Sequence, residues 1–250
     1  MASENIIEVQ KLHVGFERKI ALSSLSFSIQ KGERVALIGP SGAGKTTLLN
    51  TLATFITPTE GELQITGLNH QDSKNRKKLA KKIGMIRQQF DLVSPLPVIH
   101  NVLAGRLADW GFFKSLFSLL VPQEKTLAMK ALDRVGLKDK LYARTSTLSG
   151  GEQQRVALAR LLVQKPEIIL ADEPVASLDP ARAEDVLSIL AKLVTEENQT
   201  LIASLHSVEY AKKYFTRVIA LRDGEIFFDL PSEKIEDQNL AALYELKGKS

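Results

Sequence analysis

The chain has 250 residues, of which 44% are hydrophobic and 25% are charged, a balance that is ordinary for a soluble globular protein. Its net charge of +4 is mild, so it permits contact with an anionic membrane surface without demanding a nucleic-acid partner. The absence of cysteine excludes disulfides and thiol chemistry and fits a reducing compartment. No apolar run approaches the roughly 20 residues of a membrane-spanning helix, and the polar N-terminus lacks the apolar core of a signal peptide.

Three early stretches alternate between apolar and polar residues. They are Ile6 to Val14, Ala21 to Ile29 and Glu62 to Ile65. Alternation with period two is typical of strands that bury one face. The pattern therefore predicts an antiparallel sheet near the N-terminus.

The run Gly39 to Thr46 fits the phosphate-binding pattern G-x-x-x-x-G-K-[ST] at every fixed position, between an apolar strand and a helix. Glycines let backbone N–H groups turn inward around phosphate oxygens, and the helix N-terminus adds partial positive charge. We expect Lys45 to reach the β- and γ-phosphates and the Thr46 hydroxyl to bind Mg²⁺. The predicted nucleotide-binding residues are Gly39, Pro40, Ser41, Gly42, Ala43, Gly44, Lys45, Thr46 and Thr47.

Two features of this N-terminal part have two interpretations each. Phe16, between the first two strands, either stacks on an adenine ring or packs in the core or against the hairpin, and spacing does not separate these interpretations. The segment Ser73 to Lys82 is strongly basic, as expected of a nucleic-acid or anionic-lipid patch or of a solvated helix face. No aromatic residues interleave to stack on bases, so the solvated face is favoured.

A strand at 83–86 is followed by a segment of helical composition from Asp91 to about Pro166. Helical periods appear at 98–107, 124–135 and 153–163, which predicts a helical lobe inserted into an α/β core. The apolar stretch Trp110 to Phe117 either packs between helices of this lobe or forms a docking face for a membrane partner, since exposed aromatic patches mark interfaces.

A capping-box pattern, S-x-x-E, starts the last helix of this lobe at Ser149 and Glu152. Gly150 and Gly151 lie between them. Two glycines just inside a helix are unfavourable if capping is their only role. They suit a phosphate that approaches the backbone.

The apolar strand that begins at Glu167 ends in two carboxylates. Asp172 is predicted to hold Mg²⁺ beside the phosphate loop through a water molecule. Glu173 is predicted to point the other way along the pleat and to polarise an attacking water. Asp179 is predicted as the N-cap of the next helix, with Pro180 at its first position. His206 ends the strand at 200–205 and is predicted to contact a γ-phosphate. A hairpin around Asp223-Gly224 and one short C-terminal helix complete the chain.

Together these motifs resemble the ATP-binding subunit of ABC transporters over nearly the whole chain, about 6–230. The specific part is Leu148 to Glu152 followed by the carboxylate strand, the segment 177–179 and His206. The resemblance implies an α/β fold: a P-loop NTPase (RecA-like) core with an N-terminal antiparallel β subdomain and an inserted α-helical subdomain. We expect one ABC ATPase domain over 1–250, with the core at about 1–87 and 167–230, the helical subdomain at about 88–166 and a short C-terminal helix at 231–250.

The resemblance also implies a role for each matching residue. Gln88 corresponds to a glutamine that contacts Mg²⁺ and water and senses the permease, with Gln89 as its neighbour. Glu173 is the catalytic carboxylate, His206 the switch histidine and Asp172 a magnesium ligand. Further implied nucleotide contacts are Phe16 on adenine, Ser149, Gly150 and Gly151 on the γ-phosphate of a second subunit, and Asp179. The chain departs from the family pattern at Glu152, where glutamine is usual, and at Arg87, where an aromatic residue often stands.

The implied mechanism needs two copies of the chain and a membrane partner. Two chains pair head to tail around two ATP molecules with Mg²⁺, and loss of the γ-phosphate reopens the pair. The homodimer is expected to lie on the cytoplasmic face of the inner membrane, bound to permease subunits that receive substrate from an extracytoplasmic binding protein. No nucleic-acid partner is expected.

The transported molecule is inferred by resemblance alone. The runs 88–93, 101–107, 110–120 and 171–180 are similar to phosphonate-import ATPases, which makes phosphonates, phosphite or related phosphorus oxyanions the expected cargo. Polar amino acid import is the alternative, and lipoprotein release a more distant one. Two other classes are a soluble ABC ATPase of translation or DNA repair, and a binding module that no longer hydrolyses nucleotide.

Overall fold

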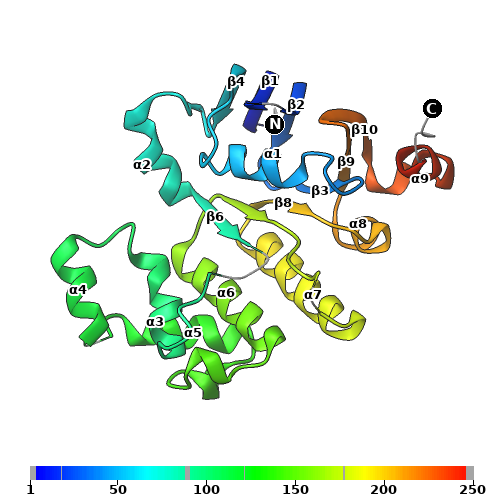
Figure 1. Ribbon diagram of the computed structural model, residues 1–250. Helices are drawn as coiled ribbons and strands as arrows, with labels where there is room; N and C mark the ends of the chain where they lie inside the picture. Colours follow the sequence, from blue (N-terminus) through cyan, green and yellow to red (C-terminus); the bar gives the residue numbers. More distant parts are fainter. Residues whose placement is uncertain (1–3, 18, 88–90, 121, 177, 246–250) are drawn as a thin grey trace.

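The computed structural model describes residues 4–17, 19–87, 91–120, 122–176 and 178–245. Figure 1 shows a small antiparallel sheet at the top, a larger sheet with helices on both faces in the middle, and a group of helices at the lower left. The small sheet has the order β2-β1-β4-β5 and the large one the order β10-β9-β3-β8-β7-β6. This arrangement is the predicted α/β class with an antiparallel part and a helical part.

The small sheet is formed by β1 (Asn5–Phe16), β2 (Lys19–Gln30), β4 (Glu60–Ile65) and β5 (Leu68–Asn69). All its pairings are antiparallel, as predicted. The first two strands are longer than their alternating cores, and β1 includes Phe16, which pairs with Lys19. Phe16 is thus the last residue of a strand and does not stand between strands.

The large sheet consists of β3 (Arg34–Ile38), β6 (Ile83–Ile86), β7 (Ile168–Ala171), β8 (Thr200–Ser204), β9 (Arg217–Arg222) and β10 (Glu225–Pro231). The strands β9, β3, β8, β7 and β6 run parallel, and β10 returns antiparallel to β9 as the predicted hairpin. Both faces of a parallel sheet are covered, so its strands are nearly continuous apolar runs.

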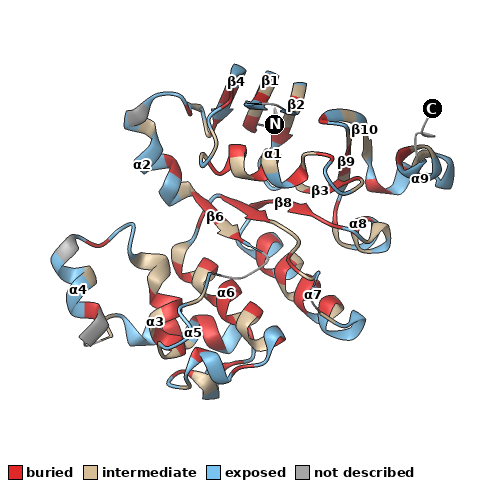
Figure 2. Ribbon diagram, in the orientation of Figure 1, coloured by how far each residue is buried: buried red, intermediate tan, exposed pale blue. Residues whose placement is uncertain are grey.

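The two faces of the large sheet bury different cores. Along β3, Val35 and Leu37 contact one core and Ala36 and Ile38 the other, as the period of two requires. The first core lies between the two sheets and contains the apolar face of α1 (Lys45–Leu52). The second joins the sheet to α7 (Pro180–Glu196), α8 (Val208–Tyr214) and the inserted helices. Figure 2 shows the buried inner faces of α6 and α7 below the sheet.

The segment between β6 and β7 is helical, and α2 (Ser73–Lys82) precedes it. Its elements are α3 (Val98–Leu103), η1 (Ala104–Arg106), α4 (Phe112–Leu120), α5 (Lys125–Arg134), η2 (Lys138–Lys140), η3 (Thr145–Thr147) and α6 (Gly150–Gln164). The predicted helical periods therefore correspond to α3, α5 and α6. In the stretch from Trp110 to Phe117, Trp110 is buried in the second core, as the packing interpretation expects. Phe117 is 54% exposed, so its side chain does not pack between the helices and its role stays a prediction.

The C-terminal segment holds two short elements, η4 (Ser232–Lys234) and α9 (Asp237–Tyr244), where the sequence predicted one helix. Leu243 is buried against the second core, and the Arg222 guanidinium donates to the carbonyls of Ala242 (2.6 Å) and Glu245 (3.0 Å). None of the helices in the described part of the chain is both long and apolar enough to cross a bilayer.

Arg217 on β9 joins the two sheets. Its guanidinium makes two hydrogen bonds of 2.6 Å to the Asp229 carboxylate and one of 2.8 Å to the Ser28 carbonyl of β2. It also contacts Glu33 at 3.2 Å. These hydrogen bonds raise the pKa of Arg217, so the group stays charged.

Candidate nucleotide-binding and catalytic site

The predicted site residues follow three neighbouring strands of the large sheet. The glycine loop follows β3, Asp172 and Glu173 follow β7, and His206 lies just past the end of β8, in the order β3-β8-β7. The carboxyl ends of adjacent parallel strands meet at one edge, where open α/β sheets bind their ligands. Residues far apart in the sequence are brought together for this reason.

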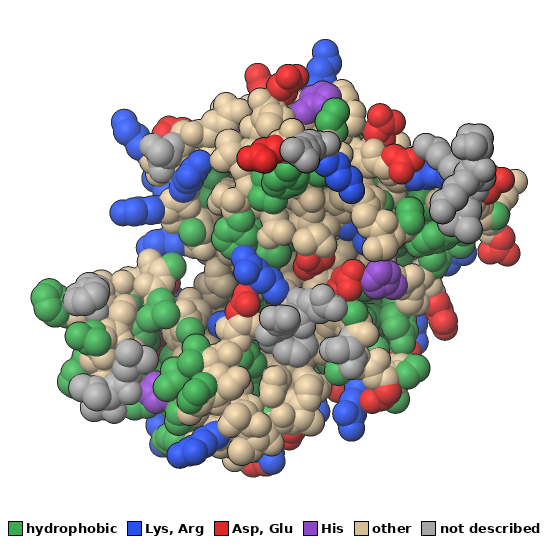
Figure 3. Space-filling model, viewed as in Figure 1, with side chains coloured by type: hydrophobic (Ala, Val, Ile, Leu, Met, Phe, Trp, Pro, Cys, Tyr) green, Lys and Arg blue, Asp and Glu red, His purple; other side chains and the backbone are tan. Residues whose placement is uncertain are grey.

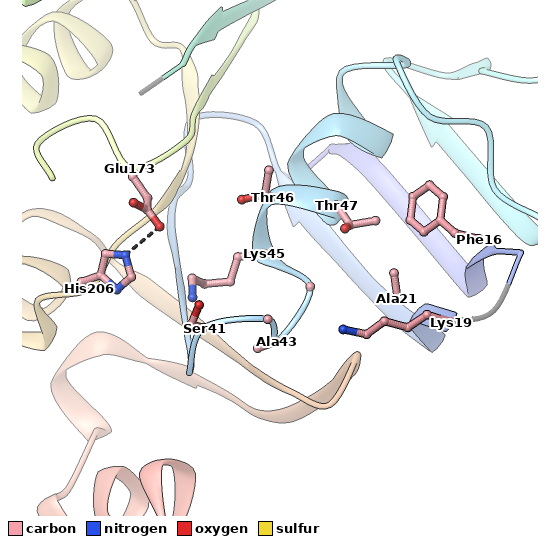
Figure 4. A pocket seen from close by; sticks show the side chains of 12 residues that line it. Phe16, Lys19, Ala21, Ser41, Ala43, Lys45, Thr46, Thr47, Glu173 and His206 are labelled. Carbon is pink, nitrogen blue, oxygen red and sulfur yellow. Dashed lines mark hydrogen bonds and ion pairs between the residues drawn. The ribbon is translucent and has the colours of Figure 1, made fainter. Parts of the chain in front are cut away.

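A pocket of about 300 Å³ lies at this edge. In Figure 4, Glu173 and His206 stand at one end of it, Phe16 at the other, and Lys45 between them. Its lining residues are Phe16, Lys19, Ala21, Ser41, Gly42, Ala43, Gly44, Lys45, Thr46, Thr47, Glu173 and His206. The pocket thus contains most of the predicted nucleotide contacts, plus Lys19 and Ala21, which the sequence motifs did not indicate.

The glycine loop holds the Lys45 side chain inside its own curve. The Lys45 ammonium donates to the carbonyls of Gly39 (2.7 Å) and Pro40 (3.2 Å). Burial lowers the pKa of Lys45, and the Glu173 and Asp172 carboxylates oppose that shift. Gly39 has a φ of 142°, and a Cβ there would lie 2.0 Å from the Leu221 carbonyl oxygen, so this turn requires glycine.

Asp172 connects the glycine loop to β8. Its Oδ1 accepts hydrogen bonds from the Thr46 hydroxyl (3.2 Å) and the Ser204 hydroxyl (2.7 Å), and the Ser204 Oγ accepts from the Glu173 amide (2.8 Å). Sequence reasoning missed Ser204. The available signal was a hydroxyl residue at the carboxyl end of a buried strand, because a buried hydroxyl needs a partner.

The donor set of Thr46 and Asp172 fits Mg²⁺. A hydroxyl and a carboxylate oxygen lie in hydrogen-bond contact, and both are hard oxygen ligands of the kind that Mg²⁺ prefers. Within the described ranges, no three or more His, Cys, Asp or Glu side chains cluster as metal ligands. Few protein ligands are usual for Mg²⁺, which retains water and binds substrate phosphates.

Glu173 and His206 lie together at one end of the pocket. The Glu173 Oε1 lies 2.6 Å from the His206 Nε2, so the carboxyl group and the imidazole share a hydrogen bond. Strand β7 ends at Ala171, and Glu173 has a left-handed backbone with φ of 48°. The expectation that pleat alternation sets its direction was therefore wrong. A non-glycine residue held in this region is strained, as is common at functional sites.

Phe16 lies at the opposite end of the pocket from Glu173. Its side chain is 53% exposed, which rules out the core-packing interpretation. An exposed ring that borders a phosphate-binding loop offers a flat π-face to a base. Lys19, across the β1–β2 turn, adds a positive charge beside it.

The remaining predicted site residues lie outside this pocket. Ser149 caps α6 with the predicted capping box: its amide donates to Glu152 Oε2 (2.8 Å), and its Oγ accepts from the Glu152 amide (3.3 Å). Hydrogen bonds from Ser149 lower the pKa of Glu152. Asp179 caps α7 by accepting from the Arg182 amide at 3.1 Å. The Gln88 prediction falls outside the described residues.

The sequence model of the family described as ABC transporter matches residues 22–176, which include the glycine loop, Ser149 and both carboxylates. The chain belongs to the ABC transporter family. Among relatives of this ABC protein, the phosphonates import ATP-binding protein PhnC 1 of Pseudomonas syringae pv. tomato is 48% identical over 90% of this chain and 86% of its own length. A protein with the same name from Nostoc sp. is 45% identical over 98% of this chain and 94% of its own length.

Solved structures agree with the cassette fold. The cbiO1 protein of Clostridium perfringens, part of the ABC transporter complex cbiONQ, superposes with a TM-score of 0.80 at 25% identity, covering 92% of this chain and 90% of that one. The ATP-binding cassette MJ0796, in a dimeric post-hydrolysis state bound to ADP and Pi, superposes with a TM-score of 0.74 at 30% identity, covering 92% of this chain and 100% of that one.

Proposed function

We propose that this ABC protein binds and hydrolyses ATP to energise import of phosphonates or related phosphorus oxyanions. The observation that supports the ATPase part is that the glycine loop, Glu173 and His206 line the same pocket. The cargo is supported by the names of the relatives, which are phosphonate importers at 42% to 48% identity. No residue of this pocket selects the cargo.

In phosphoryl transfer to water, each group of pocket residues has a separate role. Loop amides and Lys45 hold the β- and γ-phosphates, because Lys45 can exchange its two carbonyl partners for phosphate oxygens. Thr46, Asp172 and Gln88 would hold Mg²⁺, which supplies charge neutralisation of the phosphates. Phe16 stacks on adenine. Thr47 and Ser41 complete the lining of the phosphate end.

Glu173 acts on the attacking water. Its carboxylate orients the water and accepts a proton, and the His206 imidazole holds the carboxylate in place through the 2.6 Å hydrogen bond. His206 also reaches the γ-phosphate in this proposal. The strained backbone of Glu173 keeps its side chain at the pocket end even though the strand has already ended.

A second copy of the chain completes each site. Ser149 and Gly150 are exposed at the start of α6 and do not line the pocket that contains Lys45. A helix N-terminus with two glycines suits the γ-phosphate of a nucleotide held by a partner chain. Asp179 is proposed to lie at the same head-to-tail junction. We assign the whole chain to one ABC ATPase domain with the boundaries given above.

The proposed location is the cytoplasmic face of the inner membrane, with the homodimer bound to permease subunits. An extracytoplasmic binding protein would deliver the cargo to that permease. Hydrolysis removes the γ-phosphate that both copies contact, so the pair reopens and the permease changes its orientation.

Transport by the assembled complex tests the proposal. The permease that copurifies with the tagged chain is reconstituted in vesicles, and ATP-dependent uptake of labelled methylphosphonate is compared with uptake of phosphite, phosphate and histidine. We expect phosphonate or phosphite uptake that the Glu173→Gln complex lacks. Uptake of histidine alone would reassign the cargo to amino acids, and failure of any permease to copurify with the chain would favour a soluble ABC ATPase.

A further inference from the structure

We infer that helices α2 and α4 form a surface that binds an anionic lipid bilayer directly. We call this surface the lipid patch, and it consists of Lys74, Lys77 and Lys78 of α2 together with Phe113, Leu116 and Phe117 of α4. It goes beyond the proposed function, because neither nucleotide hydrolysis nor permease docking requires the chain to contact lipid. The inference rests on exposure, charge and the placement of the two helices.

Helix α4 presents large apolar side chains to solvent along one side. Phe113 is 84% exposed, Leu116 55% and Phe117 54%. Their spacing of i, i+3 and i+4 puts them on one face of the helix. Short helices with aromatic and leucine side chains on one face lie in the interfacial region of bilayers.

The opposite side of this segment is fixed to the protein. Ser118 and Trp110 are buried, and the Trp110 indole N–H and the Lys114 ammonium both donate to Glu124 Oε1, at 3.3 Å and 3.0 Å. The apolar face of α4 is therefore held outward by contacts on its other side. A rearrangement that buried this face against the same chain would break them.

Helix α2 supplies unpaired positive charge. Lys81 and Lys82 form ion pairs with Asp109 and Glu167, whereas no ion pair of Lys74, Lys77 or Lys78 occurs among the described residues, and all three are exposed. These three lysines are free to meet lipid phosphates, and each Lys near an anionic surface strengthens binding.

The carboxylates nearest to α4 are already neutralised. Asp109 pairs with Arg106 (2.7 Å) and Lys81 (3.2 Å), and Glu124 pairs with Lys114 (3.0 Å). The lipid patch consequently has net positive charge beside its apolar face, which complements an anionic bilayer and would repel a basic partner.

The two helices lie along the same edge of the molecule. The Lys81–Asp109 ion pair ties the end of α2 to the segment that leads into α4. Figure 1 shows α2 above α4 at the left edge, and Figure 3 shows Lys and Arg side chains over α2 and hydrophobic side chains over α4 on that edge. The basic surface and the apolar surface are therefore neighbours on that edge, as contact with a single bilayer requires.

Vesicle flotation of the purified full chain tests this inference. Protein-free vesicles of phosphatidylcholine alone are compared with vesicles that also contain phosphatidylglycerol, at low and high salt. We expect binding to the anionic vesicles that weakens as salt rises, because exposed charges are screened beyond about 10 Å at 0.1 M. Equal recovery with both vesicle types, or none with either, overturns the inference.

Two patch variants and two matched controls sharpen the test. Each lysine is expected to contribute about fivefold, so the triple change of Lys74, Lys77 and Lys78 to Gln reduces partitioning on the order of a hundredfold. Phe113→Ser with Phe117→Ser reduces it roughly tenfold or more at any salt concentration. The controls change the exposed Lys31, Lys212 and Lys234 to Gln, or Phe227 to Ser, and leave partitioning unchanged.

Basal ATP hydrolysis separates loss of lipid binding from loss of folding. None of the substituted residues lines the nucleotide pocket, so both patch variants keep the basal rate. If the patch variants bind vesicles as well as the unchanged chain does, or if the patch is needed only for membranes that contain the permease, the surface belongs to a protein partner and the lipid assignment is wrong.

Discussion

The Glu173 carboxylate and the His206 imidazole lie 2.6 Å apart although they follow different strands and are separated by more than thirty positions in the chain. The contact depends on the neighbouring placement of β7 and β8 and on the left-handed backbone of Glu173. The contact joins the proposed base to a more exposed group, because the Glu173 side chain is 22% exposed and the His206 side chain is 57% exposed.

Glu173→Gln should nearly abolish turnover while nucleotide binding persists. A positioned general base contributes about 10²–10⁴-fold, and glutamine keeps the shape of the side chain without its proton affinity. Phosphate release measures the rate, and gel filtration with ATP should reveal a trapped dimer. Glu167→Gln, at the other end of β7, is the matched control and should hydrolyse normally. Brisk hydrolysis by the Glu173 variant would remove this residue from the base role.

Lys45→Ala should weaken nucleotide binding itself. The ammonium would make charge-assisted hydrogen bonds to phosphates, each worth about 1.5–3 kcal/mol, so affinity should fall roughly tenfold to a hundredfold. Calorimetric titration with a nonhydrolysable ATP analogue measures the change. Lys31→Ala alters an exposed lysine outside the pocket and should bind as the unchanged chain does. Equal affinity in the two variants would contradict the assignment of the glycine loop.

Gly105→Ala should destabilise the fold although it is remote from the pocket. A Cβ at Gly105 would lie 2.5 Å from the Arg160 carbonyl oxygen of α6, which is backbone and cannot rotate away. Overpacking of this kind costs about 1–3 kcal/mol. Thermal unfolding measures the loss. Gly111→Ala is the control, because no atom lies within 4 Å of its added Cβ, and similar melting of the two variants would contradict this packing.

His70 should make stability depend on pH. Its ring is buried, and neither ring nitrogen has a hydrogen-bond partner among the described residues. Burial, with the nearby Arg76 charge, lowers its pKa below the ordinary value of 6.5. Between the two pKa values, the unfolded chain binds a proton at His70 that the folded chain does not bind. The contribution of this group to the free energy of unfolding is therefore fully present above pH 6.5 and is lost as the pH falls toward the lowered pKa.

Replacement of His70 by leucine should remove this acid sensitivity. Urea unfolding at several pH values from 7.5 to about 5 measures it, with His100→Leu as the control at a less buried histidine. A His70→Leu variant that loses as much stability between these pH values as the unchanged chain would assign the effect to other groups.

The sequence was most informative where a motif fixes its own local structure. The glycine loop, the capping box at Ser149 and the N-cap at Asp179 are local patterns, and each element begins at or close to the residue that the pattern indicates. The alternating strands were also predictable, because burial of one face requires period two.

Features that depend on neighbouring strands were not predictable. Ser204 bridges Asp172 and Glu173 only because β8 lies beside β7. Lys19 lines the pocket only because the first residue of β2 pairs with Phe16, the last residue of β1. The pleat argument for Glu173 did not apply because β7 ends at Ala171. The end of a strand is set by its partner strands, and strand boundaries are weakly encoded in local sequence.

The bond from Arg217 to Ser28 has a further consequence for the pocket. Phe16 lies on the small sheet and Lys45 on α1, which follows β3 of the large sheet. If Phe16 contacts the base and Lys45 the phosphates, as proposed, the distance between these two contacts depends on how the two sheets are placed relative to each other. The hydrogen bond from Arg217 of β9 to the Ser28 carbonyl of β2 helps to fix that placement. Under the proposed function, nucleotide binding would then depend partly on a residue outside the pocket.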